Sequence, residues 1–261
     1  MYEIEKVQLY ACKRFMSAPL RSCNAAVAGD CGRYPMYIIA SKRCIKYWLR
    51  ILVMPDYRYV KKCYNMLLYY DSIGYQNWAT KIRNNLYKNG FGYVWESQSC
   101  QNPDLFLIHY IQRLKDQYLQ DWSEECNNNA KLTSYKHFKT YFVYEHYLDV
   151  LDIKKYRYAF CTLRLSSHFL MIELGRYLGI DRDRRFCIYC KNVVENEYHF
   201  MLVCPLYHTL REYYLLKKFY ESPNIHKFNI LMSSKNESII KSTAVYIYSA
   251  LKRRSLFIQT S

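Results

Sequence analysis

The sequence has 261 residues, of which 51% are hydrophobic, and it carries a formal net charge of +16 at pH 7. This length and apolar content exclude a disordered tail and allow one large or two small domains. Glycine and proline are scarce, with 7 and 6 residues, whereas 30 tyrosines and 12 phenylalanines give a heavy aromatic load. Such a composition favours helices over strands and turns, so the sequence predicts an all-α protein made of multi-helix bundles.

The positive charge is gathered at the two ends of the chain. Basic residues outnumber acidic residues by nine to three in residues 1–50 and again in residues 201–261, whereas residues 101–150 hold five basic and seven acidic residues. A positive potential attracts phosphate backbones by releasing their counterions, and it attracts anionic membranes similarly. No apolar run reaches the length of a membrane span. We therefore expect RNA or DNA as the partner, without a membrane or a small-molecule substrate.

Cysteine usage and the first residues indicate the compartment. Residues 1–15 carry charges where a secretory signal peptide needs an apolar run. The 11 cysteines are odd in number and mostly spread singly, which does not suit a disulfide framework. We expect an intracellular protein of the cytoplasm or nucleus, whose cysteines outside one motif are buried thiols.

Apolar residues recur at helical spacing through most of the chain. In the first half, helices are expected at residues 3–16, 35–53, 58–70, 76–88 and 105–125. A turn is expected around Gly29 and Gly32, and a connector at 91–103. Three asparagines at 127–129 end the long helix, where the acidic middle gives way to a basic section. The sequence thus predicts one helical domain at 1–128 and a basic helical domain at 129–261.

The second half continues the helical pattern. Between residues 132 and 151 aromatic residues recur at three- and four-residue steps, which is more typical of a packed core than of base stacking. A second helix is expected from 154 to about 178. Further helices are expected at 205–220 and 237–256, separated by a loop around Pro223.

One motif near the C-terminal end has the spacing of a metal site. The segment CIYCKNVVENEYHFMLVCP places Cys187, Cys190, His199 and Cys204 within eighteen residues. The CxxC half suits a tight turn, and the second half reads as a short helix. Pro205 disfavours helical geometry at the residue before it, so it should turn the Cys204 thiolate back toward the ion. Four protein ligands leave no position for an activated water, so we expect a structural Zn²⁺.

Other interpretations of this motif remain open. The CxxC pair could arise by chance among so many cysteines, or could be a redox pair, although no thioredoxin-like pattern surrounds it. His208 offers a different fourth ligand, at Cys-x3-His spacing from Cys204, with His199 merely buried.

Basic residues close to the motif are candidates for phosphate contacts. Arg182, Arg184 and Arg185 immediately precede it, and a rigid metal-bound turn would hold their guanidinium groups with little loss of entropy on binding. The candidate nucleic-acid contacts are Arg164, Arg176, Arg182, Arg184, Arg185 and Lys191. A solvated patch neutralised by neighbouring aspartates is the alternative.

The usual signatures of catalysis are missing from the sequence. Enzymes that act on phosphates through two metal ions need clustered carboxylates, and the adjacent pair Glu124-Glu125 reads as a solvated helix end. The sequence has no glycine-rich phosphate loop, nucleophile elbow or HExxH motif. We therefore expect no enzymatic activity.

Several blocks together resemble the region downstream of the polymerase core in non-LTR (jockey/LINE-like) retrotransposon reverse transcriptases. They are GRYPMYIIASKRCIKYW, KLTSYKHFKTYFVYEHYL, RLSSHFLMIELGRY and RRFCIYCKNVVENEYHFMLVCPLYHTLR. The resemblance implies a thumb-like helical segment at residues 1–55 and a zinc module, here 185–210, that grips nucleic acid. Carried over by position, the zinc ligands are Cys187, Cys190, His199 and Cys204.

The chain departs from that family where catalysis resides. The family's palm carries an aromatic-x-Asp-Asp motif, and the segment YYDSIGY at residues 69–75 lacks the paired aspartate. We expect a noncatalytic protein with a thumb-like domain at 1–128 and a basic zinc-bearing domain at 129–261, which binds nucleic acid. A zinc-stabilised protein-interaction module is one alternative, and a polymerase fragment active only with missing domains is another.

Overall fold

The structure is a computed structural model that describes residues 2–260. Helices make up 69% of the chain and the described residues contain no strand, which confirms the predicted all-α class. Within this range, extended pairing is confined to a single antiparallel bridge between Phe186 and Val194.

The chain folds as two compact units. Unit 1 comprises Met1–Glu5 and Tyr34–Asp121, and unit 2 comprises Lys6–Arg33 and Trp122–Ser261. This division differs from the one expected after residue 128, because residues 6–33 belong with the C-terminal half. A contact between residues remote in sequence explains part of the difference: Arg21 Nε donates a hydrogen bond of 3.0 Å to the carbonyl of Ser167.

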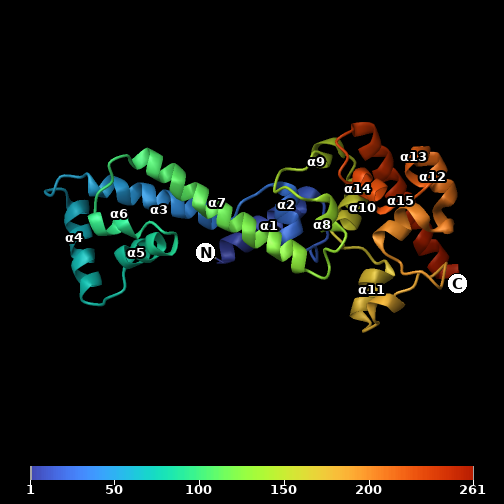
Figure 1. Ribbon diagram of the computed structural model, residues 1–261, viewed down its shortest axis with the longest axis horizontal. Coiled ribbons are helices and arrows are strands. Elements are labelled where there is room, and N and C mark those ends of the chain that lie inside the picture. Colours follow the sequence, from blue (N-terminus) through green and yellow to red (C-terminus); the bar gives the residue numbers. More distant parts are fainter. Residues whose placement is uncertain (1, 261) are drawn as a thin grey trace. The chain divides into compact units, whose positions relative to one another are not determined.

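The helices of unit 1 follow the periodicity of the sequence closely. They are α3 (Met36–Leu52), α4 (Tyr59–Ser72), α5 (Trp78–Lys88) and α6 (Gly92–Ser97), with the start of α1 (Tyr2–Met16) and most of α7 (Pro103–Asn128) (Figure 1). A capping box begins α5, since the Asn77 side chain accepts from backbone N–H groups while Thr80 accepts from the Asn77 N–H. The short helix α6 lies where only a connector was expected.

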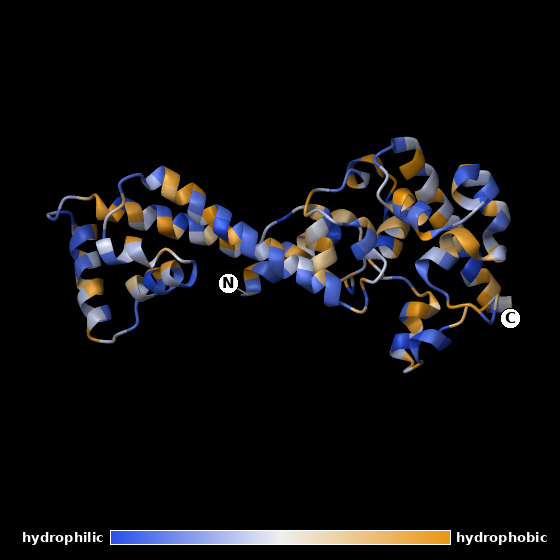
Figure 2. Ribbon diagram, viewed as in Figure 1, coloured by the Kyte–Doolittle hydropathy of each residue, from blue (hydrophilic) through white to orange (hydrophobic). Residues whose placement is uncertain are grey.

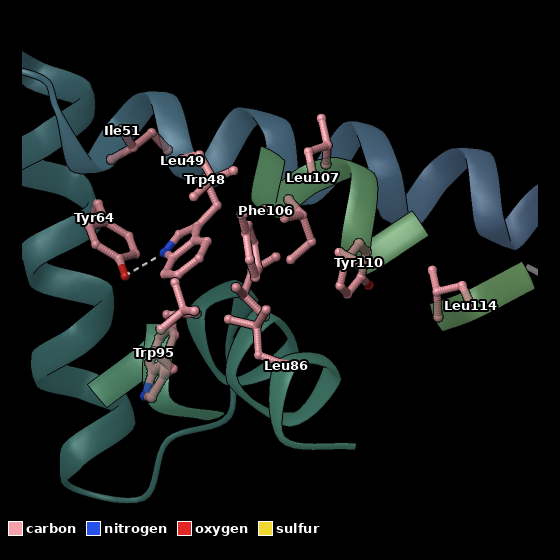
Figure 3. Packing of buried hydrophobic residues seen from close by; sticks show 14 of the residues in the cluster. Trp48, Leu49, Ile51, Tyr64, Leu86, Trp95, Phe106, Leu107, Tyr110 and Leu114 are labelled. Atoms are coloured by element: carbon pink, nitrogen blue, oxygen red, sulfur yellow. Dashed lines mark hydrogen bonds between the residues drawn. The ribbon is translucent and has the colours of Figure 1, made fainter. Parts of the chain in front are cut away.

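Aromatic side chains form the core of unit 1. Apolar and hydrophilic residues alternate along α3, as in a helix with one buried face (Figure 2). From that face Trp48 reaches between α4 and α6, where its ring stacks on Trp95 with centroids 5.9 Å apart (Figure 3). Its indole N–H donates a hydrogen bond of 2.8 Å to the Tyr64 hydroxyl, and that hydroxyl donates to Gln98 Oε1 at 2.6 Å. The buried polar atoms of Trp48 and Tyr64 are therefore satisfied without water.

Unit 2 contains the second set of helices. They are α2 (Asn24–Cys31), α8 (Tyr135–Phe138), α9 (Tyr147–Val150), α10 (Lys154–Arg164), α11 (Met171–Tyr177), α12 (His208–Tyr214), α13 (Lys217–Tyr220), α14 (Ile225–Met232) and α15 (Glu237–Thr260). Short 3₁₀ segments η1 (Arg182–Arg184) and η3 (Pro205–Tyr207) and a π-helix η2 (His199–Val203) complete it. The long helix α15 packs against α10 and α12 (Figure 1).

Helix α2 lies where the small residues of the sequence predicted a turn. Gly29 is inside this helix, and a β carbon there would come within 2.8 Å of the side chains of Trp122 and Tyr135. Only Gly32, with φ of +57°, has the left-handed geometry of a turn, and it ends the helix. The small residues therefore serve close packing, which the local pattern does not distinguish from a turn.

The helix expected from 154 to 178 is interrupted. It forms α10 and α11, separated at residues 165–170, where Ser166 has φ of +48° and Ser167 N–H donates to Thr162 O at 2.8 Å. Likewise, residues 132–151 form only the short α8 and α9, and residues 205–220 form η3, α12 and α13. The aromatic stripe nevertheless packs as expected, because Tyr135 and Phe138 are buried.

A buried ion pair links α2 to α10. The carboxylate of Asp30 and the guanidinium of Arg164 are fully buried, with Arg164 Nε 2.8 Å from Asp30 Oδ2. The hydroxyls of Tyr135 and Tyr147 each donate to Asp30 at 2.9 Å. Arg164 also lies 3.2 Å from a Glu145 oxygen and donates to the Met232 carbonyl. This network joins five segments of unit 2. The carboxylate of Asp30 and the guanidinium of Arg164 therefore have partners inside the protein although water does not reach them.

Candidate metal centre

The four residues of the Cys/His motif lie together in unit 2. One ligand atom from each of Cys187, Cys190, His199 and Cys204 lies within 4.8 Å of all the others. Cys204 Sγ is 3.8 Å from the sulfur atoms of both Cys187 and Cys190. A tetrahedral ion with metal–sulfur bonds of about 2.3 Å holds its sulfur ligands about 3.8 Å apart. The residues present therefore fit a four-coordinate metal ion.

A hairpin positions the first two thiols. The bridge between Phe186 and Val194 closes this hairpin, hereafter called the metal hairpin (residues 186–194), and Cys187 N–H donates to Val193 O at 2.7 Å. At its tip, the nearby backbone N–H groups of Tyr189 and Cys190 lower the pKa of the Cys187 thiol. These donors converge on one sulfur atom and favour its thiolate form.

A π-helix positions the other two ligands. Cys204 N–H donates to His199 O at 2.8 Å, which is the five-residue hydrogen bond that defines η2. This wider turn brings two residues five positions apart to the same side. Cys204 itself is extended, with ψ of 123°, as predicted from Pro205.

The fourth residue of the cluster is His199 and not His208. Both ring nitrogens of His199 are buried, and among the described residues neither has a hydrogen-bond partner. A buried imidazole without a partner is costly unless a metal ion occupies one of its nitrogens. His208 is exposed and lies 3.3 Å from Glu212 on the surface of α12. The alternative in which His208 closes the site is therefore wrong.

The three thiols differ in their readiness to ionise. A hydrogen bond from Cys204 lowers the pKa of Cys187 to about 3. The same hydrogen bond raises the pKa of Cys204, and burial raises the pKa of Cys190. The pKa of one thiol is thus lowered beside two thiols whose pKa is raised, and a divalent ion would displace the remaining thiol protons on binding.

Residues outside the motif support the cluster. Arg211 Nη2 donates to the Cys204 carbonyl at 2.7 Å. On the other side, Arg254 of α15 forms two hydrogen bonds of 2.7 Å with the buried carboxylate of Glu195, next to the hairpin. Sequence reasoning did not identify these residues. A charged residue on the inner face of an otherwise apolar helix, such as Arg254, is the one signal that could have pointed to them.

The tip of the metal hairpin holds Lys191 in a left-handed conformation, with φ of +62°. A residue with a β carbon is strained there, whereas glycine is not. We expect Lys191→Gly to raise the free energy of unfolding of unit 2 by about 0.5–1 kcal/mol, measured by urea denaturation. Lys191→Ala removes the same charge but keeps the β carbon, so it should give no gain. Equal effects of the two substitutions would contradict the assignment of strain.

The predicted phosphate contacts fall into two groups. Arg182, Arg184 and Lys191 are exposed on η1 and the metal hairpin. Arg185 is half-buried, and its guanidinium donates to the carbonyls of Ile180 and Ile172 at 2.9 and 2.7 Å, so its role is structural.

The two remaining candidates lie on α10 and α11. Arg176 is partly exposed and pairs with Glu173 at 3.0 Å. Arg164 is wrong as a nucleic-acid contact, because the network around Asp30 buries its side chain completely. The spacing of the apolar residues correctly placed Arg164 on a helix, but it did not reveal which face of that helix is buried.

Within residues 2–260, every helix is too short or too polar to cross a membrane. Comparison of the chain with models of protein families, with curated proteins and with solved structures gives no match.

Proposed function

We propose that the chain is a noncatalytic zinc protein that binds RNA or DNA and is related to the C-terminal part of non-LTR retrotransposon reverse transcriptases. The observation that carries the proposal is the placement of exposed Arg182, Arg184 and Lys191 on and beside a hairpin that holds two of four converging metal ligands. A fixed backbone lowers the entropy lost when such side chains meet phosphates.

Zinc is the metal that suits this ligand set best. Three thiolates and one imidazole favour a borderline-soft ion in tetrahedral geometry, and intracellular sites of this composition are structural zinc sites. All four positions are filled by protein atoms, so the ion would not present a water for hydrolysis. Its role would be to join the metal hairpin to η2.

The segment nearest to a polymerase motif also favours a noncatalytic role. In YYDSIGY the one carboxylate, Asp71, accepts a hydrogen bond of 2.6 Å from Thr80 and lies 3.2 Å from Arg83. These contacts join α4 to α5, and they explain the aspartate without a metal ion. Primer extension by this chain alone should therefore be absent.

A salt series on the full chain tests the binding proposal. Labelled single strands of RNA and DNA are titrated between 50 and 300 mM salt, and the logarithm of affinity should fall linearly with the logarithm of salt. Arg182→Ala with Arg184→Ala should make that slope less steep by about 1.4, because each phosphate contact on a single strand contributes about 0.7. Lys218→Ala with Lys235→Ala is the matched control, since both lysines are exposed elsewhere in unit 2. Absent or salt-independent binding would contradict the proposal and favour a protein-interaction module.

A further inference from the structure

A groove of 730 Å³ lies between α10 and α15, which run side by side in unit 2 (Figure 1). It is separate from the four metal ligands. The described residues that line it are Lys154, Lys155, Tyr158, Ala159, Tyr248, Leu251, Lys252 and Ser255. Three of these eight are lysines and none carries a carboxylate, so the lining has a uniform positive charge.

The floor of the groove is apolar and aromatic. Tyr158 leaves 46% of its surface exposed, and Leu251 and Ala159 lie beside it in the lining. Tyr248 is held in place by Tyr156, with ring centroids 5.4 Å apart in an edge arrangement. The groove therefore combines a fixed ring, a second ring with an open surface, and cations around them. This is the combination that takes single-stranded nucleic acid, in which bases stack and phosphates meet lysines.

Lys155 is placed between the charged and the aromatic parts. Its Nζ lies 4.9 Å from the ring centroid of Tyr156 and 5.3 Å from that of Tyr248. Both contacts have cation–π geometry, which restricts the position of the ammonium group. A lysine restricted in this way loses less conformational entropy when it binds a phosphate than a free lysine would.

The start of α10 adds an independent reason to expect an anion. Lys154 and Lys155 occupy its first turn, no acidic residue is present there, and Ile153 at the N-cap offers no side-chain hydrogen bond to the free N–H groups. Cations are unfavourable at this end of a helix because its dipole is positive there. An anion bound by Lys154 and Lys155 would relieve this repulsion.

We infer that this groove binds a segment of single-stranded nucleic acid, with phosphates on Lys154, Lys155 and Lys252 and a base against Tyr158. The inference that the ligand is a nucleic acid rests on the proposed function. The position of this site and its preference for a single strand do not depend on the arginines of η1. Helix α15 lines the groove, and further along it Phe257 contacts Tyr189 of the metal hairpin, with ring centroids 5.5 Å apart. The same helix thus connects the groove to the metal centre.

Charge substitutions in the full chain test the phosphate contacts. Lys155→Ala with Lys252→Ala should weaken binding of fluorescein-labelled dT20 and U20 at least 10-fold at 100 mM salt and lower the salt slope by about 1.4. Lys218→Ala with Lys235→Ala removes the same charge from other exposed positions and should change affinity less than 3-fold. Equal losses in both double variants would overturn the groove, because only net charge would then matter.

Ring substitutions test the stacking contact. Tyr158→Ala should weaken single-strand binding about 5- to 100-fold without changing the salt slope, whereas Tyr158→Phe keeps the ring and should bind like the unchanged protein. Tyr141→Ala is the control, since Tyr141 is 76% exposed and outside the groove. A 20-base-pair duplex should be affected less than dT20.

The outcomes separate the two proposals. If the unchanged chain binds dT20 and U20 but the groove variants bind equally well, the groove assignment fails while the proposed function stands. If the unchanged chain binds neither oligonucleotide, the proposed function fails. If the groove variants lose binding only to phosphatidylserine vesicles, a lipid surface and not a nucleic acid occupies the groove, and the inference is overturned.

Discussion

Replacing Cys204 by serine should abolish stoichiometric zinc binding and unfold the region from residue 186 to about 215. Cys204 is fully buried, and its sulfur lies 3.8 Å from each of the other two cysteine sulfurs. Structural zinc in small modules contributes on the order of 10 kcal/mol, which is comparable with the whole stability of a domain. Without the ion, the side chains of the metal hairpin and η2 would lose the common centre that joins them. Amide hydrogen exchange across 186–215 measures the expected loss of protection.

A matched cysteine substitution separates loss of the metal from loss of packing. Cys126 is also buried in unit 2 but lies outside the cluster. Cys126→Ser should lower stability by about 1–3 kcal/mol, the cost of a buried hydroxyl, while retaining the full zinc content. Retention of zinc by the Cys204→Ser protein, or unchanged exchange in 186–215, would contradict the assignment of Cys204 as a ligand.

The substitution Asp30→Asn should lower the free energy of unfolding of unit 2 by about 3–5 kcal/mol. It leaves the Arg164 guanidinium buried with only the partly exposed Glu145 to balance its charge. Tyr135 and Tyr147 also lose a charged acceptor for their hydroxyls. Urea denaturation, followed by hydrogen exchange in α2 and α10, measures the effect where the network lies.

Two further variants give this experiment its controls. Asp149 is exposed and accepts a hydrogen bond from Tyr144, so Asp149→Asn should change stability by less than about 1 kcal/mol. Adding Arg164→Met to Asp30→Asn removes the uncompensated charge and should recover part of the loss. A cost of Asp30→Asn no greater than that of Asp149→Asn would contradict the role of the buried pair.

The features that the sequence predicted best are those that depend on local pattern, namely helix positions and helix caps. The periodicity of α3, α4, α7 and α15 set their positions within a few residues, and Asn77 and Asn102 are caps that a reader of the sequence can find. The cluster of Cys187, Cys190, His199 and Cys204 was also predictable, because all four lie within eighteen residues at the spacing of a metal site.

What could not be predicted depends on contacts between distant segments. Arg164 looked like a surface cation because its partner Asp30 lies 134 residues away in the chain. Gly29 looked like a turn residue because the sequence around it carries no signal that Trp122 packs against it. The break after α10 has a similar origin, since Ser167 donates to Ser22, which is 145 residues distant. Tertiary packing overrides helical periodicity at these points.

Metal analysis of the purified full chain, combined with X-ray absorption at the metal edge, tests the central claim most directly. The account predicts one zinc ion per chain, bound by three sulfur atoms at about 2.3 Å and one nitrogen at about 2.0–2.1 Å, with no oxygen ligand. A chain purified without a stoichiometric metal ion, or an ion with fewer than three sulfur ligands, would contradict it.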